Sequence, residues 1–179
     1  MNGDEPAALN GEYKNKDMAQ ETQIRKATNA DIPRIMELLH QVNMVHQQLR
    51  PDLFKPHTTK YDEKELADMM KTETQPIFVY DEGRVSGYAF CQIHEVRDDR
   101  LLHDRKTLYI DDLCVDESAR GKHIGRQLFD HVREYAAAIG CQAITLNVWE
   151  GNDAAMRFYR NIGMQVQKTC MEMNWPPAP

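Results

Sequence analysis

The stretch YIDDLCVDESARGKHIGRQLF, from Tyr109 to Phe129, joins an apolar run to the beginning of a helix. The apolar residues leading to Val115 are typical of a strand. Further on, apolar residues recur every three or four positions, at Ile124, Leu128, Val132, Tyr135 and Ile139. That spacing indicates a helix with one buried face, and Gly140 is suited to end it. The stretch therefore predicts a strand at residues 107–115, a short loop, and a helix from about residue 122 to 139.

The loop ahead of this helix combines two glycines, Gly121 and Gly125, with the basic residues Arg120, Lys122 and Arg126. A helix start leaves backbone N–H groups without intrahelical acceptors and carries partial positive charge, so it attracts phosphate. Glycine lets the backbone approach an anion closely, and basic side chains add donors. Neither a Walker loop nor a GxGxxG fingerprint is present. We expect a phosphate-binding helix start; the alternative is a helix that merely begins with glycines and a basic face.

The residues around this stretch predict alternating helices and strands. A turn at residues 81–84, which contains Gly83, joins two strands into a hairpin. In chain order we expect a strand at 24–28, helices at 32–49 and 62–71, strands at 77–80, 85–94 and 107–115, a helix at 122–139, a strand at 143–149, a helix capped by Asn152 or Asp153 and ended by Gly163, and a strand at 164–175. This order predicts a mixed α/β domain.

Length and composition restrict the class of protein. The 179 residues suit a single domain at 22–175, with a leader at 1–21 and a tail at 176–179. A net charge of −6 argues against a nucleic-acid partner, and no stretch approaches the ~20 apolar residues of a membrane span. The cysteines and histidines show no metal-ligand spacing, so no metal is expected. Four widely spaced cysteines, Cys91, Cys114, Cys141 and Cys170, indicate free thiols in the cytoplasm.

The whole pattern resembles the GNAT superfamily of N-acetyltransferases, whose members bind acetyl-CoA. The quoted stretch is similar to their Arg/Gln-x-x-Gly-x-Gly/Ala loop, with Arg120 in the first position and Gly125 in the last. His123 stands where the family usually has its middle glycine. The second similar segment is NVWEGNDAAMRFYRNIGM, residues 147–164. The resemblance covers about residues 24–175.

This resemblance implies a fold and a cofactor site. The fold is α/β (α+β mixed), with a central, mostly antiparallel sheet of six to seven strands that splays at the cofactor site, flanked by about four helices. Acetyl-CoA would be the acetyl donor. Its pyrophosphate would lie on Arg120, Gly121, Lys122, His123, Ile124, Gly125 and Arg126, and its pantetheine arm along Leu113, Cys114 and Val115. Asn152 would lie near the arm or its phosphates, and Tyr159 near the thioester sulfur.

The implied reaction is direct attack of an amine on the acetyl carbonyl. Tyr159 is the candidate proton donor to the leaving sulfur; the alternative is a core tyrosine. Asp111 and Asp112 are candidates on the amine side, and strand alternation predicts that they face opposite ways. The sequence YIDDL resembles a stretch of the diamine and polyamine acetyltransferases, which places Asp111 at their acidic base. Binding of the substrate ammonium and simple strand capping are the alternatives for Asp111.

The acceptor is left open by the sequence. The acidic balance and the YIDDL stretch favour a primary amine of a small molecule, such as a polyamine. A protein lysine or N-terminal amine is the second hypothesis, and a non-catalytic acyl-CoA sensor is the third. The segment HQQLRPDLFKP, residues 46–56, resembles a wall of the acceptor cleft in the family. A homodimer is expected by analogy with the family.

Overall fold

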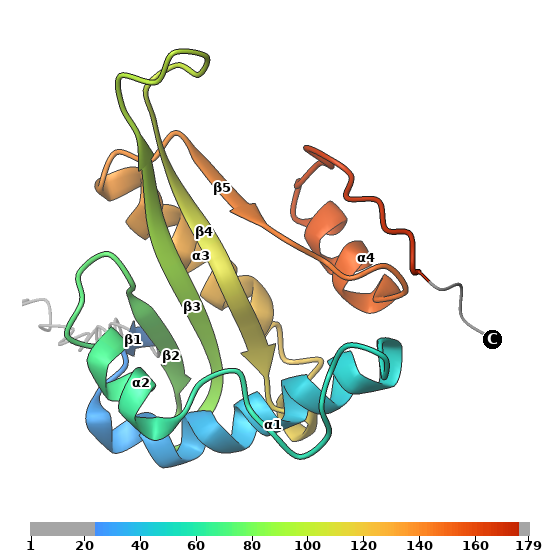
Figure 1. Ribbon diagram of the computed structural model, residues 1–179. Helices are drawn as coiled ribbons and strands as arrows, with labels where there is room; N and C mark the ends of the chain where they lie inside the picture. Colours follow the sequence, from blue (N-terminus) through green and yellow to red (C-terminus); the bar gives the residue numbers. More distant parts are fainter. Residues whose placement is uncertain (1–23, 176–179) are drawn as a thin grey trace, which may run out of the picture.

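The structure is a computed structural model that describes residues 24–175. The expected leader at 1–21 and tail at 176–179 lie outside these residues. Five strands and four α-helices make up the described part (Figure 1). In chain order they are β1 (Ile24–Lys26), α1 (Ile32–Leu49), α2 (Glu63–Met69), β2 (Ile77–Asp81), β3 (Val85–Val96), β4 (Arg105–Val115), α3 (Ile124–Ala138), β5 (Ala143–Leu146) and α4 (Asp153–Asn161), with short 3-10 helices at Asn29–Asp31 and Glu117–Ala119.

The sheet is mixed and has the order β1-β2-β3-β4-β5. The first three pairings are antiparallel, and β4 and β5 are parallel. The ladder between β4 and β5 ends where Ile110 pairs with Leu146, although β4 continues to Val115. Beyond that pair the two strands diverge, as Figure 1 shows. The sheet is therefore open on one side of the second half of β4.

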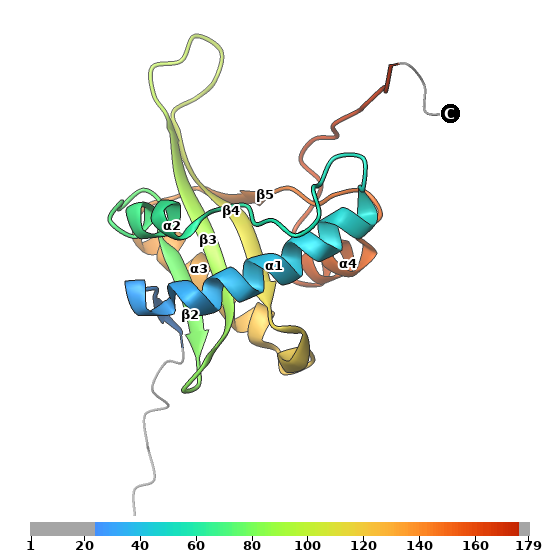
Figure 2. The ribbon, with the colours of Figure 1, turned by 60° about the horizontal axis from the view of Figure 1, so that its bottom comes forward.

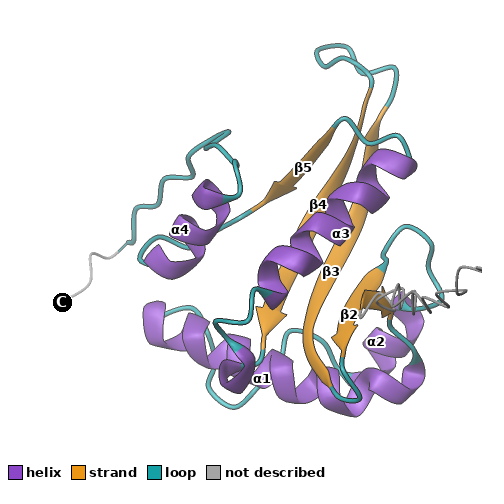
Figure 3. Ribbon diagram, turned by 180° about the vertical axis from the view of Figure 1, so that it is seen from behind, coloured by secondary structure: helices purple, strands orange, loops and turns teal. Residues whose placement is uncertain are grey.

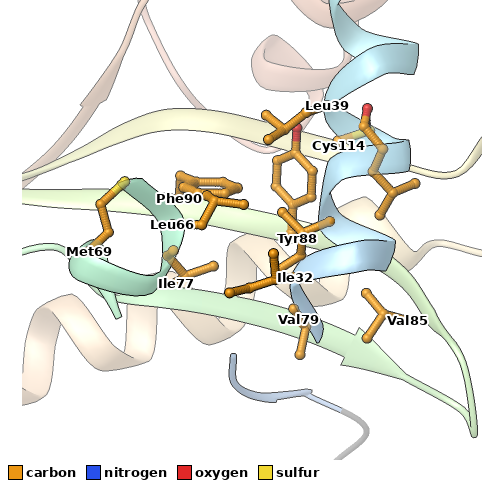
Figure 4. Close-up of a cluster of buried hydrophobic side chains, with 12 residues drawn as sticks. Ile32, Leu39, Leu66, Met69, Ile77, Val79, Val85, Tyr88, Phe90 and Cys114 are labelled. Carbon is orange, nitrogen blue, oxygen red and sulfur yellow. Dashed lines mark hydrogen bonds between the residues drawn. The ribbon is translucent and has the colours of Figure 1, made fainter. Parts of the chain in front are cut away.

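Helices cover both faces of the sheet. α1 and α2 pack on one face and α3 on the other (Figures 2 and 3). Under α1 and α2, the buried cluster includes Tyr88, Phe90 and Leu66 (Figure 4). Under α3, Phe129 and Val132 pack with residues such as Leu108 of β4. These two apolar layers hold β4 in place. Truncating one buried side chain of such a layer to alanine lowers the free energy of unfolding by about 2–5 kcal/mol.

No helix between residues 24 and 175 is both long and apolar enough to cross a bilayer.

The expected sheet of six to seven strands is wrong: residues 24–175 contain five. The predicted strand at 143–149 already ends at Leu146, and residues 164–175 form no strand. Met171 and Met173 are 86% and 89% exposed in this last segment. A strand needs a neighbouring edge for its backbone groups, and residue pattern alone cannot indicate whether one is available. The mixed sheet and the four helices are confirmed.

Candidate functional site

A cavity of about 1000 Å³ opens where β4 and β5 separate. Three parts of the chain line it besides β4: the helix-start loop (residues 120–126), the segment 147–159 that leads into α4, and the end of α1 with the loop after it. Volumes of 300–1000 Å³ are usual for sites that bind small molecules and cofactors. The cavity therefore lies at the upper end of the range for a cofactor site.

The helix-start loop contributes Arg120, Gly121, His123, Ile124, Gly125 and Arg126 to this cavity. Lys122 is exposed and does not line it. Within α3, the Gln127 N–H donates to the His123 carbonyl at 3.1 Å. Helix geometry leaves the amide groups of the preceding residues without intrahelical acceptors. These donors, at the positive end of a 15-residue helix, fit a diphosphate group.

His123 adopts the left-handed backbone conformation, with φ 61° and ψ 13°. A residue with a Cβ is strained there, whereas glycine is not. This explains physically why a glycine is usual at the matching position of the similar loops. His123 therefore stands at a backbone position that glycine would adopt without strain.

Gly125 lies close to two neighbours. A Cβ built on it would lie 3.5 Å from the Phe158 ring and 3.5 Å from Val115 Cγ2, which is ordinary contact. A methyl group therefore fits at this position. A longer side chain would need room that the loop, β4 and α4 take up.

The second half of β4 brings Leu113, Cys114 and Val115 to the cavity. Their ladder with β3 continues on one side, whereas β5 has left the other side. Unpaired strand edges offer backbone donors and acceptors to an extended ligand. Burial raises the pKa of the Cys114 thiol to about 12, so this cysteine is not suited to act as a nucleophile.

Helix α4 supplies Asn152 and Tyr159. Asn152 is the N-cap, and its side-chain oxygen accepts a hydrogen bond from the Ala155 N–H at 3.1 Å. Tyr159 lines the cavity, and burial raises the pKa of its phenol well above the usual value. No hydrogen-bond partner of its hydroxyl is found among residues 24–175. The hydroxyl is thus protonated at neutral pH and available to donate.

The two aspartates of β4 lie at an irregularity of the strand. Phe90 pairs with Asp112 and Cys91 pairs with Ile110, so Asp111 is an extra residue opposite β3. Such a bulge interrupts the alternation of side chains. Both aspartates consequently line the same cavity. The expectation that they face opposite sides of the sheet is wrong, because it assumed an uninterrupted period of two.

Asp111 is held by two groups from the loop after α1. Its side chain is only 8% exposed; Lys60 Nζ lies 2.7 Å from Oδ1, and the Tyr61 hydroxyl donates to Oδ2 at 2.6 Å. Tyr61 is itself stacked on Phe90, with ring centroids 5.6 Å apart. The carboxylate therefore already binds one ammonium group in a position set by an anchored tyrosine.

Asp112 has a different environment. The Tyr88 hydroxyl donates to its Oδ2 at 2.8 Å. Burial raises the pKa of Asp112 to about 6, and the Tyr88 hydrogen bond and the Lys60 charge oppose that rise. A carboxyl group with this pKa changes its protonation state close to neutral pH, which is the range a general base needs. No group of three or more metal-ligating side chains is found between residues 24 and 175.

Three aromatic rings, those of His46, Phe54 and Trp149, also line the cavity. The Phe54 ring lies 5.0 Å from His46 and 5.3 Å from Trp149, and Arg50 lies over Trp149 at 5.8 Å. These residues come from the end of α1, the loop after it and the segment after β5. Residues 46–56, expected to wall an acceptor cleft, do line the cavity in part.

Sequence reasoning missed three residues of this site: Lys60, Tyr61 and Tyr88. Tyr61 is 50 positions from its partner Asp111, and Tyr88 is 24 from Asp112. No local motif marks such contacts. The one available signal was chemical, because two adjacent carboxyl groups in an apolar strand require polar partners.

Comparison with known proteins identifies similar sequences. The sequence profile of the acetyltransferase (GNAT) family matches residues 42–164. Spermine/spermidine N(1)-acetyltransferase of Bacillus subtilis (strain 168) is 27% identical over 92 residues, which is 51% of this chain and 59% of that protein. The matched part thus spans less than two thirds of that relative.

Two solved structures share the fold. A mutant form of the BH1408 protein from Bacillus halodurans has a TM-score of 0.81 and 33% identity, over 84% of this chain and 98% of that one. An aminoglycoside acetyltransferase from an uncultured soil metagenomic sample has a TM-score of 0.65 and 17% identity, over 87% of this chain and 95% of that one. At this lower identity the likeness concerns the fold alone.

Proposed function

The chain belongs to the acetyltransferase (GNAT) family and is an N-acetyltransferase, and on that premise we propose that it moves the acetyl group of acetyl-CoA to a primary amine of a small molecule. The observation that carries this proposal is the aspartate pair of β4. Asp111 already holds an ammonium group, that of Lys60, in the cavity that the helix-start loop also lines. The similar Bacillus subtilis protein is named for two polyamines, which supports a polyamine-like acceptor.

The family uses acetyl-CoA, and the residues of this chain fit it. We assign the diphosphate to the amide groups at the start of α3, with charge added by Arg120 and Arg126. The pantetheine arm is assigned to the free edge of Leu113, Cys114 and Val115. When bound, the cofactor supplies an acetyl thioester as the electrophile.

On the acceptor side, we assign binding of the ammonium to Asp111 and removal of its proton to Asp112. This replaces the role of base that the resemblance gave to Asp111 with the alternative of ammonium binding. An alkylammonium has a pKa of about 10.4, so only about one amine in a thousand is free at neutral pH. Producing the free amine therefore costs about 4 kcal/mol, which the site has to offset. Asp112 is suited to accept the proton, since its pKa lies at about 6 and it lines the same cavity.

Tyr159 is assigned to the leaving group. Its hydroxyl keeps its proton at neutral pH and has no described partner, so it can donate a hydrogen bond or the proton to the departing sulfur. The remaining expectations, a cytoplasmic location and a homodimer, stay predictions. The free thiols at positions 91, 114, 141 and 170 fit a reducing compartment.

A thiol-release assay across an amine panel tests the function. The purified chain is mixed with acetyl-CoA and, separately, with polyamines, aminoglycosides, amino acids and lysine-containing peptides. We expect the fastest release of CoA with a polyamine, because Asp111 and Asp112 favour a cationic acceptor. Faster turnover of the peptides would support protein acetylation instead. Tight acetyl-CoA binding without turnover of any amine would support a sensor.

A further inference from the structure

We propose that Lys60 is a site of self-acetylation, at which the chain transfers an acetyl group to its own side chain. This inference rests on the proposed function. Lys60 Nζ lies 2.7 Å from Asp111 Oδ1 and 3.3 Å from the Asp111 carbonyl oxygen. The amine of Lys60 thus occupies the place assigned above to the acceptor's ammonium.

The position of Lys60 is fixed by its neighbour. Tyr61 stacks on Phe90 of β3, and its hydroxyl donates to Asp111 at 2.6 Å. Lys60 also lies over the Tyr61 ring, with Nζ 5.6 Å from the centroid. An anchor of this kind keeps the lysine in the cavity and confers the rate advantage of an intramolecular reaction.

Lys60 shares the cavity with the residues assigned to the reaction. The same cavity is lined by Asp112, Cys114 and Tyr159. Lys60 is also close enough to Asp112 that its charge lowers the pKa of that carboxyl. The groups proposed to remove a proton and to stabilise the leaving sulfur therefore line the same cavity as this amine.

The reaction balances without a further reactant. Lys60 ammonium first loses a proton to Asp112. The neutral Nζ then forms an amide bond with the acetyl carbonyl carbon, the carbon–sulfur bond of the thioester breaks, and the second proton of the attacking amine ends on the sulfur of CoA. The product, acetyl-lysine, is neutral and cannot form an ion pair with Asp111.

Mass spectrometry of the full chain tests the inference. The protein is incubated with excess acetyl-CoA and no amine, and peptide mapping follows each lysine over time. We expect Lys60 to gain an acetyl group at least ~10-fold faster than Lys64 and Lys71, at a rate independent of protein concentration. Lys64 and Lys71 are matched controls, because their side chains are 88% and 70% exposed, against 46% for Lys60. Simple chemical acetylation would favour those more exposed lysines.

Two variants sharpen the result. Lys60→Arg keeps the charge and should remove the fast acetylation. Gly125→Glu should lower the acetylation rate of Lys60 to that of the surface lysines. A chain that turns over an amine but modifies Lys60 no faster than Lys64 overturns this inference alone. A rate that rises with protein concentration also overturns it. A chain that turns over no amine of the panel and leaves Lys60 unmodified overturns the proposed function as well.

Discussion

The helix-start loop and the acceptor side of the cavity are built by different means. The loop, residues 120–126, is one continuous segment whose proposed ligand contacts are backbone amide groups. The acceptor side, comprising Lys60, Tyr61, Tyr88, Asp111 and Asp112, brings side chains together from three distant parts of the chain. A site built from backbone is set by local conformation, whereas a site built from side chains depends on the packing of the whole fold.

This difference predicts how each region tolerates change. The loop should respond to the size and charge of a side chain placed against its amide groups. The acceptor side should respond to the chemistry of single groups, since each of its two carboxyl groups has a named partner. Variants in the loop should consequently lose cofactor binding, and variants on the acceptor side should lose turnover.

Gly125→Glu should give the largest effect. A carboxylate at the helix start repels a diphosphate, and its side chain is too long for the space against Phe158 and Val115. We expect acetyl-CoA affinity to fall at least ~100-fold, measured by calorimetry, because like charges in a partly desolvated site cost several kcal/mol. Gly125→Ala is the control: its Cβ makes ordinary contacts at 3.5 Å and should leave affinity nearly unchanged. Equal affinity in the glutamate variant would rule out the assigned diphosphate site.

Asp111→Asn and Asp112→Asn should separate the two carboxyl groups. Losing the base at position 112 should lower kcat about 100-fold, whereas losing the ammonium contact at 111 should mainly raise KM. In the unaltered chain, kcat should fall as pH drops through about 6, because Asp112 becomes protonated. Only Asp112→Asn should remove this inflection.

The exposed Asp68, which pairs with Lys71, serves as a matched control for these variants. Asp68→Asn should leave both kinetic constants unchanged. If Asp111→Asn removed the inflection near pH 6 and Asp112→Asn did not, the two roles would have to be exchanged.

The same contrast explains what the sequence could predict. The helix spacing from Ile124 onward and the glycines of the loop are local signals, so the α3 helix and its start were predictable. The shared face of Asp111 and Asp112 was not, because it depends on a bulge in pairing with β3. Lys60 was missed because nothing near it in sequence indicates that it meets Asp111. Residues 164–175 form no strand because they do not pair with β5, the outer strand of the sheet, and residue pattern does not reveal such pairing.

Tyr159→Phe should have an intermediate effect. Removing the hydroxyl takes away a donor to the leaving sulfur, so kcat should fall about 10-fold to 100-fold while acetyl-CoA affinity stays the same. Stopped-flow or steady-state thiol release measures the loss. Tyr135→Phe is the control, since Tyr135 packs against Phe78 on the α3 side of the sheet. An undiminished kcat in Tyr159→Phe would return this residue to a packing role.

Asp112→Asn should also stabilise the fold at neutral pH. The pKa of Asp112 is raised in the folded state, so its contribution to stability is greatest below the unfolded pKa of about 3.9 and is lost as pH rises through about 6. Asparagine carries no such penalty. At pH 8 we expect the free energy of unfolding of Asp112→Asn to exceed that of the unaltered chain by about 1 kcal/mol. At pH 4 we expect no difference between the two chains. Urea unfolding at both pH values measures the difference. Equal gains in stability at pH 8 and pH 4 would contradict a raised pKa of Asp112.

His123→Gly should have the smallest effect, and it tests whether the loop is governed by backbone alone. At φ 61° the histidine is strained by about 1 kcal/mol, but glycine loses about as much through its freer unfolded chain. The two terms nearly cancel, so stability should change by less than about 1 kcal/mol. His123→Ala keeps both the strain and the stiffer unfolded chain, so we expect its stability to match that of the glycine variant within about 1 kcal/mol. If the alanine and glycine variants bind acetyl-CoA as tightly as the unaltered chain does, His123 contributes only its backbone to binding. A loss of affinity in both variants would show that the imidazole contacts the ligand.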